Sequence, residues 1–436
     1  MTRWLVMALC LIAVEAGAAT VAQPREPRDW SNVKIVPSTG ITLGQTEWVT
    51  GDIATVSAAA GIPMAWYSPW RGNWTDGYLS GVPHIDLGKV RQSWREGRVV
   101  LVQAFNNVGG ADSEHPTGYT IDKLLAGDYN AELTTFAAEL RAFGYPVFIQ
   151  VGREPNGAGN AYYGGFGPLG DQTLAWAVTN RAAYNSFTPP APPSGASTLY
   201  DGLASATGCD GRERLTAAQR YIHDYLVRRE GLGFLTFDTQ GWAVKGAGTI
   251  ANEANEFSAP DQAYALALLT DCDDFSKFYP GDAYADWVSI NLHCIDYYQA
   301  GFPSFGLPSD ILIPMSFWFS ELDDTYAKIQ SVTTHPIMFT ELSFPDGTST
   351  SSAYAATKVT DGLTTFLSTY PQIRGATFWS NFPPNWPLVD VFPFDTLIRN
   401  GSLQGTALRN VVTGNSGRVH GCAAFSNGYT RRNCVD

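Results

Sequence analysis

The chain contains the stretch Phe143-Gly-Tyr-Pro-Val-Phe-Ile-Gln-Val-Gly-Arg-Glu-Pro-Asn-Gly157. Its run from Val147 to Val151 is mostly apolar and β-prone, which predicts a buried strand. Glu154 follows closely, and a Pro-Asn-Gly turn signal comes after it. A carboxylate just past the carboxyl end of a buried strand is typical of the active-site rim of a (β/α)8 barrel.

A second stretch has the same form, His335-Pro-Ile-Met-Phe-Thr-Glu-Leu-Ser-Phe-Pro-Asp-Gly347. A proline again precedes a buried strand, Glu341 ends it, and a Pro/Gly turn signal follows. Two such strands in one barrel predict two carboxylates on the same rim. Paired carboxylates of this kind are the apparatus of glycoside hydrolysis.

Strand-like and helical runs alternate along the chain, which predicts an α/β fold with a parallel sheet. The predicted strands cover 35–43, 62–68, 98–105, 147–154, 233–238, 286–293, 337–341 and 374–380. Eight strands is the number that closes a (β/α)8 TIM barrel. Between the third and fourth of them, 121–142 has the spacing of an amphipathic helix. Residues 155–212 form a long insertion after strand 4, and the alternation resumes behind it.

The ends of the chain predict processing and an appended segment. Residues 1–18 resemble a signal peptide, with Arg3, an apolar core and a small-residue cleavage site at Ala16-Gly-Ala18. The apolar run is too short to span a bilayer. We therefore expect a secreted, extracellular protein with a catalytic barrel over 19–410 and a short Cys-containing C-terminal extension over 411–436.

Composition limits the partners. The formal net charge is −13 and no Lys/Arg run is present, which argues against nucleic acid or an anionic membrane as the partner. The 13 Trp residues fit either a sugar-binding cleft or a large core. No clustered ligand set predicts a metal, and we expect a monomer that needs no cofactor.

Cysteine usage predicts disulfides. Cys10 lies in the predicted signal peptide. The remaining five are Cys209, Cys272, Cys294, Cys422 and Cys434. In an oxidising compartment an odd number predicts two disulfides and one free thiol. Cys422–Cys434 is the first choice of pair, and Cys209–Cys272 is the second.

Glu154 and Glu341 are the candidate catalytic pair. A retaining glycosidase needs two carboxyl groups about 5–5.5 Å apart, one as nucleophile and one as acid/base. Arg153 is a candidate for sugar contact or for a salt bridge on the rim. Asn156 is a candidate for hydrogen bonding to a sugar hydroxyl, or for shaping the turn.

His293 and several tryptophans complete the candidate site. His293 ends the sixth predicted strand, where it could hydrogen-bond a catalytic carboxylate. Trp379 ends the eighth, where an indole could stack under a sugar ring or pack in the core. The further candidate platforms are Trp66, Trp70, Trp74, Trp318 and Trp386.

Five segments, in order, resemble glycoside hydrolase family 26, a clan A (β/α)8 family of mainly β-mannanases. They are Leu124–Ala131, Phe148–Gly157, Gln219–Gly231, Tyr279–Val288 and Tyr326–Ile329 continuing into His335–Glu341. The resemblance implies Glu154 as acid/base, Glu341 as nucleophile, and retention of anomeric configuration. It also implies Trp379 as the platform at the cleavage subsite and endo-β-1,4-mannanase-like action on a polysaccharide or oligosaccharide.

Three departures from the family pattern leave the sugar open. Arg153 stands where the family usually has His, and His293 stands where it usually has Tyr. Residues 158–163 replace its aromatic cluster. An endo-β-glucanase or β-xylanase on the same fold, a non-catalytic carbohydrate-binding barrel, and a structural cell-wall protein are the alternatives.

Overall fold

A computed structural model describes part of the chain. The described residues are 29–47, 52–69, 85–104, 121–152, 156, 174–186, 211–239, 241–255, 257–294, 313–344, 352–380 and 402–429. At a few positions within these ranges, including Trp379, only the backbone is described.

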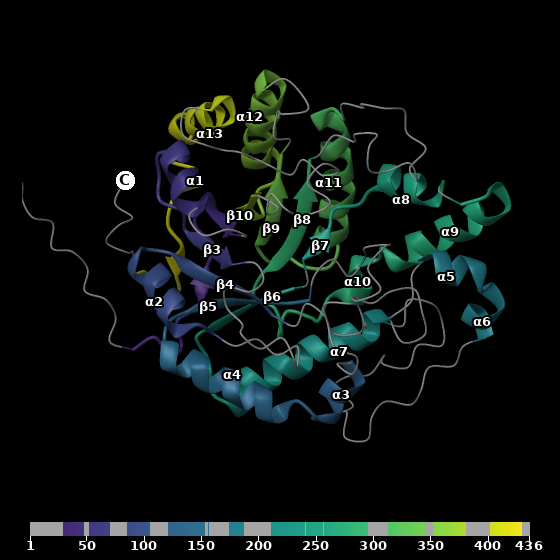
Figure 1. The fold of residues 1–436 in the computed structure, drawn as a ribbon, viewed down its shortest axis with the longest axis horizontal. Coiled ribbons are helices and arrows are strands. Elements are labelled where there is room, and N and C mark those ends of the chain that lie inside the picture. Colours follow the sequence, from purple (N-terminus) through teal and green to yellow (C-terminus); the bar gives the residue numbers. More distant parts are fainter. Residues whose placement is uncertain are drawn as a thin grey trace, which may run out of the picture.

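Within these ranges eight parallel strands follow one another around a barrel (Figure 1). They are β2 (Ile41–Glu47), β3 (Trp66–Pro69), β4 (Val99–Ala104), β5 (Val147–Val151), β6 (Leu235–Asp238), β8 (Val288–His293), β9 (Ile337–Ser343) and β10 (Ile373–Ser380). The ring closes between β6 and β8, where Asp238 bridges Trp287 in parallel and the Thr239 N–H donates to the Trp287 carbonyl at 3.2 Å. The predicted α/β class and (β/α)8 barrel are therefore confirmed.

The first predicted strand is two pieces. Its start, β1 (Ile35–Val36), pairs antiparallel with β12 (Ala424–Phe425) and takes no part in the barrel. The barrel begins at Ile41, after a bend at Gly40. A Cβ on Gly40 would lie 1.9 Å from the Arg418 carbonyl oxygen, so only glycine allows the two backbones to approach here. A short strand, β7 (Trp242–Ala243), pairs with β8 and was not predicted because two residues carry no periodic signal.

Trp66, Phe148 and Trp287 form an aromatic floor, which fills the barrel near the amino-terminal ends of the strands. Their ring centroids lie 5.3–5.9 Å apart in edge-to-face pairs, an arrangement that aromatic rings prefer. Gly44 of β2 faces this floor, and a Cβ there would lie 2.3 Å from the Trp66 Cβ. Because Gly44 has no side chain, it leaves room for the Trp66 side chain beside β2.

Helices cover the outside of the barrel (Figure 1). They are α1 (Asp52–Ala60), α2 (Leu87–Arg95), α3 (Ile121–Ala126), α4 (Asn130–Phe143), α7 (Gly211–His223) continuing as the π-helical segment η2 (Asp224–Arg229), α10 (Phe275–Phe278), α11 (Met315–Gln330), α12 (Ser352–Thr369) and α13 (Leu403–Gly414). The predicted helix 121–142 is split between α3 and α4 because Gly127 adopts φ +88°. Gly144, with φ +76°, ends α4 as a left-handed cap.

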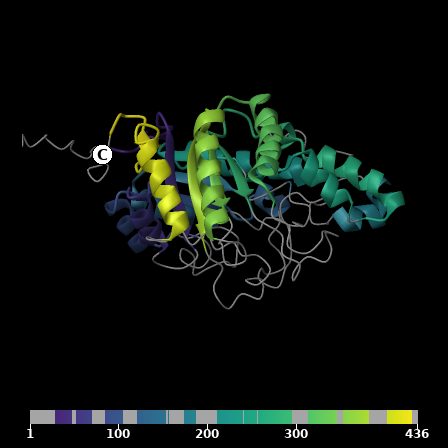
Figure 2. The same cartoon turned by 90° about the horizontal axis from the view of Figure 1, so that it is seen from above.

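Four helices form a lobe at one side of the barrel (Figures 1 and 2). This helical lobe consists of α5 (Leu174–Thr179), α6 (Arg181–Ser186), α8 (Ala247–Ala254) and α9 (Ala259–Cys272). It has a small core of its own. The core residues are Leu174, Ala177, Val178, Ile250, Ala254, Ala265 and Leu269. The predicted insertion after strand 4 thus supplies α5 and α6, and these pack with helices that follow β7.

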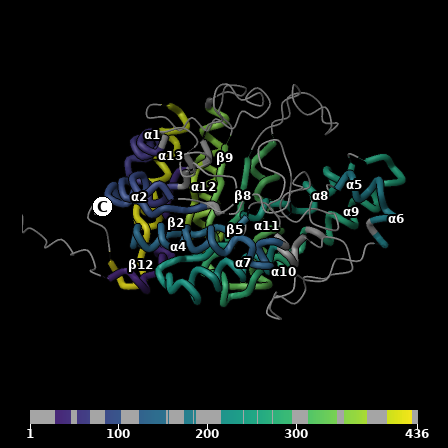
Figure 3. Tube along the Cα trace, turned by 60° about the horizontal axis from the view of Figure 1, so that its bottom comes forward, coloured from purple at the N-terminus to yellow at the C-terminus, as the bar shows by residue number. Residues whose placement is uncertain are grey.

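The last described residues return to the first ones (Figure 3). Strand β11 (Val419–His420) pairs with β2, β12 pairs with β1, and α13 packs on α1 and α12. The predicted boundary at residue 411 falls inside α13. Cys422 is disulfide-bonded and Cys294 is a buried free thiol. The predicted partner Cys434 lies outside the described residues, so that pairing remains a prediction.

Candidate active site

Glu341 lies at a bulge in β9. Ile290 of β8 pairs with Phe339, but the next residue, Asn291, pairs with Glu341, which leaves Thr340 as an extra residue on β9. The register between β9 and β10 shifts beside the same residues. Side chains on a regular strand alternate between faces, and a bulge re-aims them. Thr340 and Glu341 are adjacent in sequence, yet both contact interior side chains of β8.

His293 lies between Glu341 and Ser343. Its Nδ1 is 2.9 Å from the Ser343 hydroxyl oxygen, and its Nε2 is 3.5 Å from Glu341 Oε2. Glu341 and Ser343 are fully buried, whereas the His293 side chain is 23% exposed. The sequence predicted that His293 could reach a carboxylate at the strand ends, and the structure places its ring beside the Glu341 carboxylate.

A layer of buried amides and hydroxyls lies one step earlier along the same strands. Gln150 Nε2 donates to the Ser289 hydroxyl at 3.0 Å and to the Thr340 hydroxyl at 3.1 Å. The Thr340 hydroxyl in turn donates to Asn291 Oδ1 at 2.8 Å. These bonds join β5, β8 and β9 across the barrel, and they fix the residue that forms the bulge beside Glu341.

Asp238 is a fully buried carboxyl group at the end of β6. It is the register partner of Gln150. Neither Asp238 oxygen has a hydrogen-bond partner, and Gln150 Oε1 also lacks one. Burial raises the pKa of Asp238 well above its ordinary value, although the nearby Ser289 hydroxyl and Thr239 N–H lower it. A protonated Asp238 would supply a donor in a region that otherwise has three unpaired acceptors.

Asn156 is a structural clamp. Its Nδ2 donates to the Ala243 carbonyl and to Asp273 Oδ1, both at 2.8 Å, and its Oδ1 accepts the Ala243 N–H at 3.0 Å. The side chain is buried and its amide group is used within the protein. The predicted sugar contact of Asn156 is therefore wrong, and the alternative role in shaping the backbone holds.

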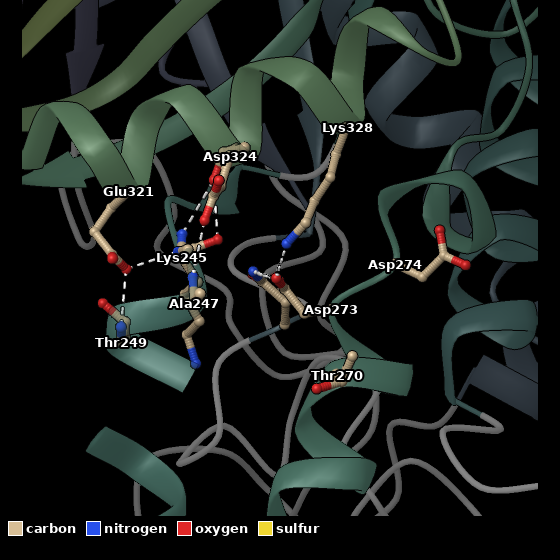
Figure 4. A network of polar contacts seen from close by, with 12 residues as sticks. Lys245, Ala247, Thr249, Thr270, Asp273, Asp274, Glu321, Asp324 and Lys328 are labelled. Atoms are coloured by element: carbon tan, nitrogen blue, oxygen red, sulfur yellow. Dashed lines mark hydrogen bonds and ion pairs between the residues drawn. The ribbon is translucent and has the colours of Figure 1, made fainter. Parts of the chain in front are cut away.

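An ion pair from α11 supports this clamp (Figure 4). Lys328 Nζ lies 2.5 Å from Asp273 Oδ2. Burial raises the pKa of Asp273, while Lys328 and Asn156 lower it. Asn156 and Asp273 together thus connect the segment after β5 with β7 and α11.

Glu321, on the same face of α11, holds the first turn of α8 (Figure 4). Its carboxylate accepts the backbone N–H groups of Gly246, Gly248 and Thr249 at 2.7–3.1 Å. A carboxylate is well placed at a helix N-terminus, where free N–H groups and the positive end of the helix dipole face it. The helical lobe is thereby attached to the barrel.

Two of the predicted tryptophan platforms belong to the core. Trp66 is 1% exposed, and its Nε1 donates to the Thr42 hydroxyl at 2.7 Å. Trp318 is also buried, on α11. The substrate-binding prediction for Trp66 is therefore wrong, because its ring forms part of the aromatic floor.

Several predicted site residues lie outside the described residues. They are Arg153, Glu154, Trp70, Trp74 and Trp386. The backbone of Trp379 lies in β10, in register with Thr46, and its side chain is not described. The roles of these residues remain predictions.

The described ranges contain no group of three or more His, Cys, Asp or Glu residues that could hold a metal ion. None of the helices in those ranges is long and apolar enough to cross a membrane.

Sequence reasoning missed Ser343 and the polar layer. A signal for the layer exists in β8, where Ser289, Asn291 and His293 alternate with apolar residues. In a barrel whose outer face is covered by helices, such alternation indicates polar side chains in the interior. Ser343 gave no comparable signal, because the bulge shifts the phase of β9.

Comparison with known proteins gave matches in structure only. No protein-family model matches the chain, and no curated protein matches it in sequence. Three solved structures illustrate the matches. A Bacillus subtilis mannanase gives a TM-score of 0.47 at 13% identity, covering 91% of this chain and 90% of its own. GH26C from Muricauda sp. MAR_2010_75 gives 0.48 at 12% identity, covering 89% and 87%. A modular endo-β-1,4-mannanase from Cellulomonas fimi gives 0.46 at 14% identity, covering 90% and 74%.

Proposed function

We propose that this protein is a secreted retaining glycoside hydrolase that cleaves β-linked polysaccharide, with endo-β-1,4-mannanase-like action. The observation that carries the proposal is the position of Glu341. The bulge in β9 turns this buried carboxylate into the barrel near the carboxyl ends of the strands, with the His293 ring at 3.5 Å. In barrel enzymes the chemistry takes place at this end.

In the proposed reaction Glu341 is the nucleophile. Its carboxylate attacks the anomeric carbon while Glu154 gives its proton to the departing glycosidic oxygen. A glycosyl ester forms on Glu341. Water then attacks the same carbon, Glu154 takes the proton of that water, and the ester bond to Glu341 breaks. Two inversions restore the original anomeric configuration.

His293 has the position to support the nucleophile. An N–H directed at a carboxylate stabilises its ionised form, which is the form that attacks. The fixed ring also limits the rotation of the Glu341 side chain. Trp379, Trp70 and Arg153 are the residues that we propose for sugar contact.

Mannan is the proposed substrate because five segments of the chain resemble glycoside hydrolase family 26, and that family acts mainly on mannans. We test it by measuring product release from glucomannan, galactomannan, mixed-linkage glucan and β-1,3-xylan. The wild type should release oligosaccharides from the mannans. Glu341→Gln should lose at least about a thousandfold in kcat, as expected for loss of a nucleophile.

Glu321→Gln is the matched control, because it changes another buried glutamate on a helix outside the site. It should lower stability and keep turnover. Full activity in folded Glu341→Gln would contradict the nucleophile assignment. Release from only the glucan or the xylan would contradict the mannan assignment.

The proposed secretion has a separate test. The exported protein should begin at Ala19, after cleavage behind Ala16-Gly-Ala18. N-terminal sequencing of the protein recovered outside the cell gives the answer, and retention of Met1 in the recovered protein would contradict a cleaved signal peptide.

A further inference from the structure

We propose that Ser343 is a positioning residue for the nucleophile, because its buried hydroxyl selects the His293 tautomer that directs Nε2–H at Glu341. This inference deepens the proposed function and rests on it for its catalytic consequence. The tautomer itself is a property of the folded protein, so it is tested without any substrate.

The Ser343 hydroxyl is buried and forms its hydrogen bond with the His293 ring. The residue is fully buried in β9 and pairs in register with His293 of β8. Its carbonyl oxygen accepts the Cys294 N–H at 2.9 Å. Over the described ranges, the hydroxyl has a single hydrogen-bond partner, His293 Nδ1 at 2.9 Å.

The two neutral tautomers of His293 differ in how they satisfy these contacts. With the proton on Nε2, the Ser343 hydroxyl donates to the unprotonated Nδ1 and Nε2–H faces the Glu341 carboxylate. With the proton on Nδ1, that N–H points at Ser343, the hydroxyl hydrogen has no acceptor, and the Nε2 lone pair faces a carboxylate oxygen. Leaving a buried donor unpaired is unfavourable, so the Nε2–H tautomer is the stable one.

The consequence for the reaction follows from this selection. The donor that faces Glu341 is present whenever the Ser343 hydroxyl is there to occupy Nδ1. Without that hydroxyl the ring can adopt either tautomer and rotate more freely. The nucleophile is then aligned and stabilised for a smaller fraction of the time, which affects the chemical step more than substrate binding.

The test reads the ring nitrogens of His293 by NMR in protein labelled with nitrogen-15 histidine. The chain contains six histidines, and the signals that disappear in His293→Gln assign His293. In the wild type we expect an unprotonated Nδ1 and a protonated Nε2. Ser343→Ala should shift both signals toward the average of the two tautomers and lower kcat about tenfold with little change in KM. Ser343→Thr, which keeps the hydroxyl, should restore the wild-type pattern.

Ser289→Ala is the matched control. It removes a buried serine hydroxyl from the same interior face of β8 without touching His293, so the His293 signals should not move. A protonated Nδ1 in the neutral ring of the wild type, or unchanged His293 signals in Ser343→Ala, would overturn the proposal. If the wild type cut no β-glycan, the proposed function would fail, and the NMR signals would still decide the tautomer.

Discussion

The Asp238 carboxyl group is completely buried, and its two oxygens and the side-chain oxygen of its register partner Gln150 are all unpaired acceptors. An ionised carboxylate there would repel the side-chain oxygen Oε1 of Gln150 and would lack solvation. A neutral carboxyl group removes both costs and can donate one hydrogen bond. At the residue scale, Asp238 is therefore expected to carry its proton at neutral pH.

This protonation predicts how stability depends on pH. The pKa of Asp238 is raised in the folded state, so the folded protein binds a proton that the unfolded chain releases above about pH 4. The stability that this proton contributes is present below that pH and is lost as pH rises toward the folded pKa. Asp238→Asn carries a permanent amide donor at the same position. Its free energy of unfolding should therefore fall less with rising pH than that of the wild type.

Urea unfolding of both proteins between pH 4 and pH 8 measures the difference. The stability of the variant relative to the wild type should increase steadily across this range. A constant difference would show that Asp238 has an ordinary pKa in the folded protein, and a decreasing one would show that its ionised form is stabilised.

At the element scale, the bulge in β9 depends on the Thr340 hydroxyl. This hydroxyl accepts from Gln150 and donates to Asn291. Thr340→Val keeps the shape and removes both bonds, which leaves buried polar groups unpaired. We expect a loss of about 2 kcal/mol in stability and a fall in kcat, because the bulge sets the direction of Glu341.

Thr236→Val is the matched control for this prediction. The Thr236 hydroxyl is also buried in the barrel, on β6, and accepts the Ile35 N–H far from Glu341 along the strands. Its loss should lower stability while kcat stays near the wild-type value. Equal kcat losses in the two variants would show that the bulge contributes nothing beyond general stability.

The clamp that joins the segment after β5 to β7 and α11 gives a second prediction at this scale. Lys328→Met would leave the Asp273 carboxylate buried without its cation, which costs about 2 kcal/mol after allowing for the partial exposure of Lys328. Lys277→Met, which breaks a more exposed pair with Asp271, should cost less than about 1 kcal/mol. Thermal or urea unfolding compares the two, and equal losses would contradict a supporting role for the Asp273 ion pair.

At the scale of the whole molecule, the two ends of the described chain form one unit with the barrel. Phe425 of β12 packs against Trp30 and Trp94, with ring centroids 5.5 and 5.9 Å apart. Phe425→Ala should therefore destabilise the protein by about 3–4 kcal/mol. Leu403→Ala, at a residue that is 53% exposed, should change stability by less than about 0.5 kcal/mol. A small effect of Phe425→Ala would show that the C-terminal segment is separable.

The order of the barrel strands could be predicted from the sequence, because buried strands produce apolar runs and the helices between them have their own period. Six of the eight predicted strands overlap the observed strands closely, and the second, 62–68, shares only 66–68 with β3. The first predicted strand joined β1 to the start of β2. The division at Gly40 depends on the approach of Arg418, far away in sequence. No local pattern carries information of that kind.

The candidate site was less predictable. The proximity of His293 to Glu341 could be expected because strand ends in a barrel share one rim, and their catalytic roles stay predictions. Trp66 and Asn156 were misassigned because their residue types fit both a sugar site and a core, and only tertiary contacts distinguish the two. Ser343 depends on a bulge, which shifts the alternation of side chains by one residue and cannot be located from an apolar run alone.

Covalent trapping of the glycosyl–enzyme tests the central claim most directly. The probe is an activated 2-deoxy-2-fluoro glycoside of the sugar that the polysaccharide panel identifies, and the measurement is peptide mass analysis of the inactivated protein. We predict one glycosyl adduct, on the peptide that contains Glu341, and none in Glu341→Gln. Turnover without an adduct, or an adduct on a different carboxylate, would contradict Glu341 as the nucleophile.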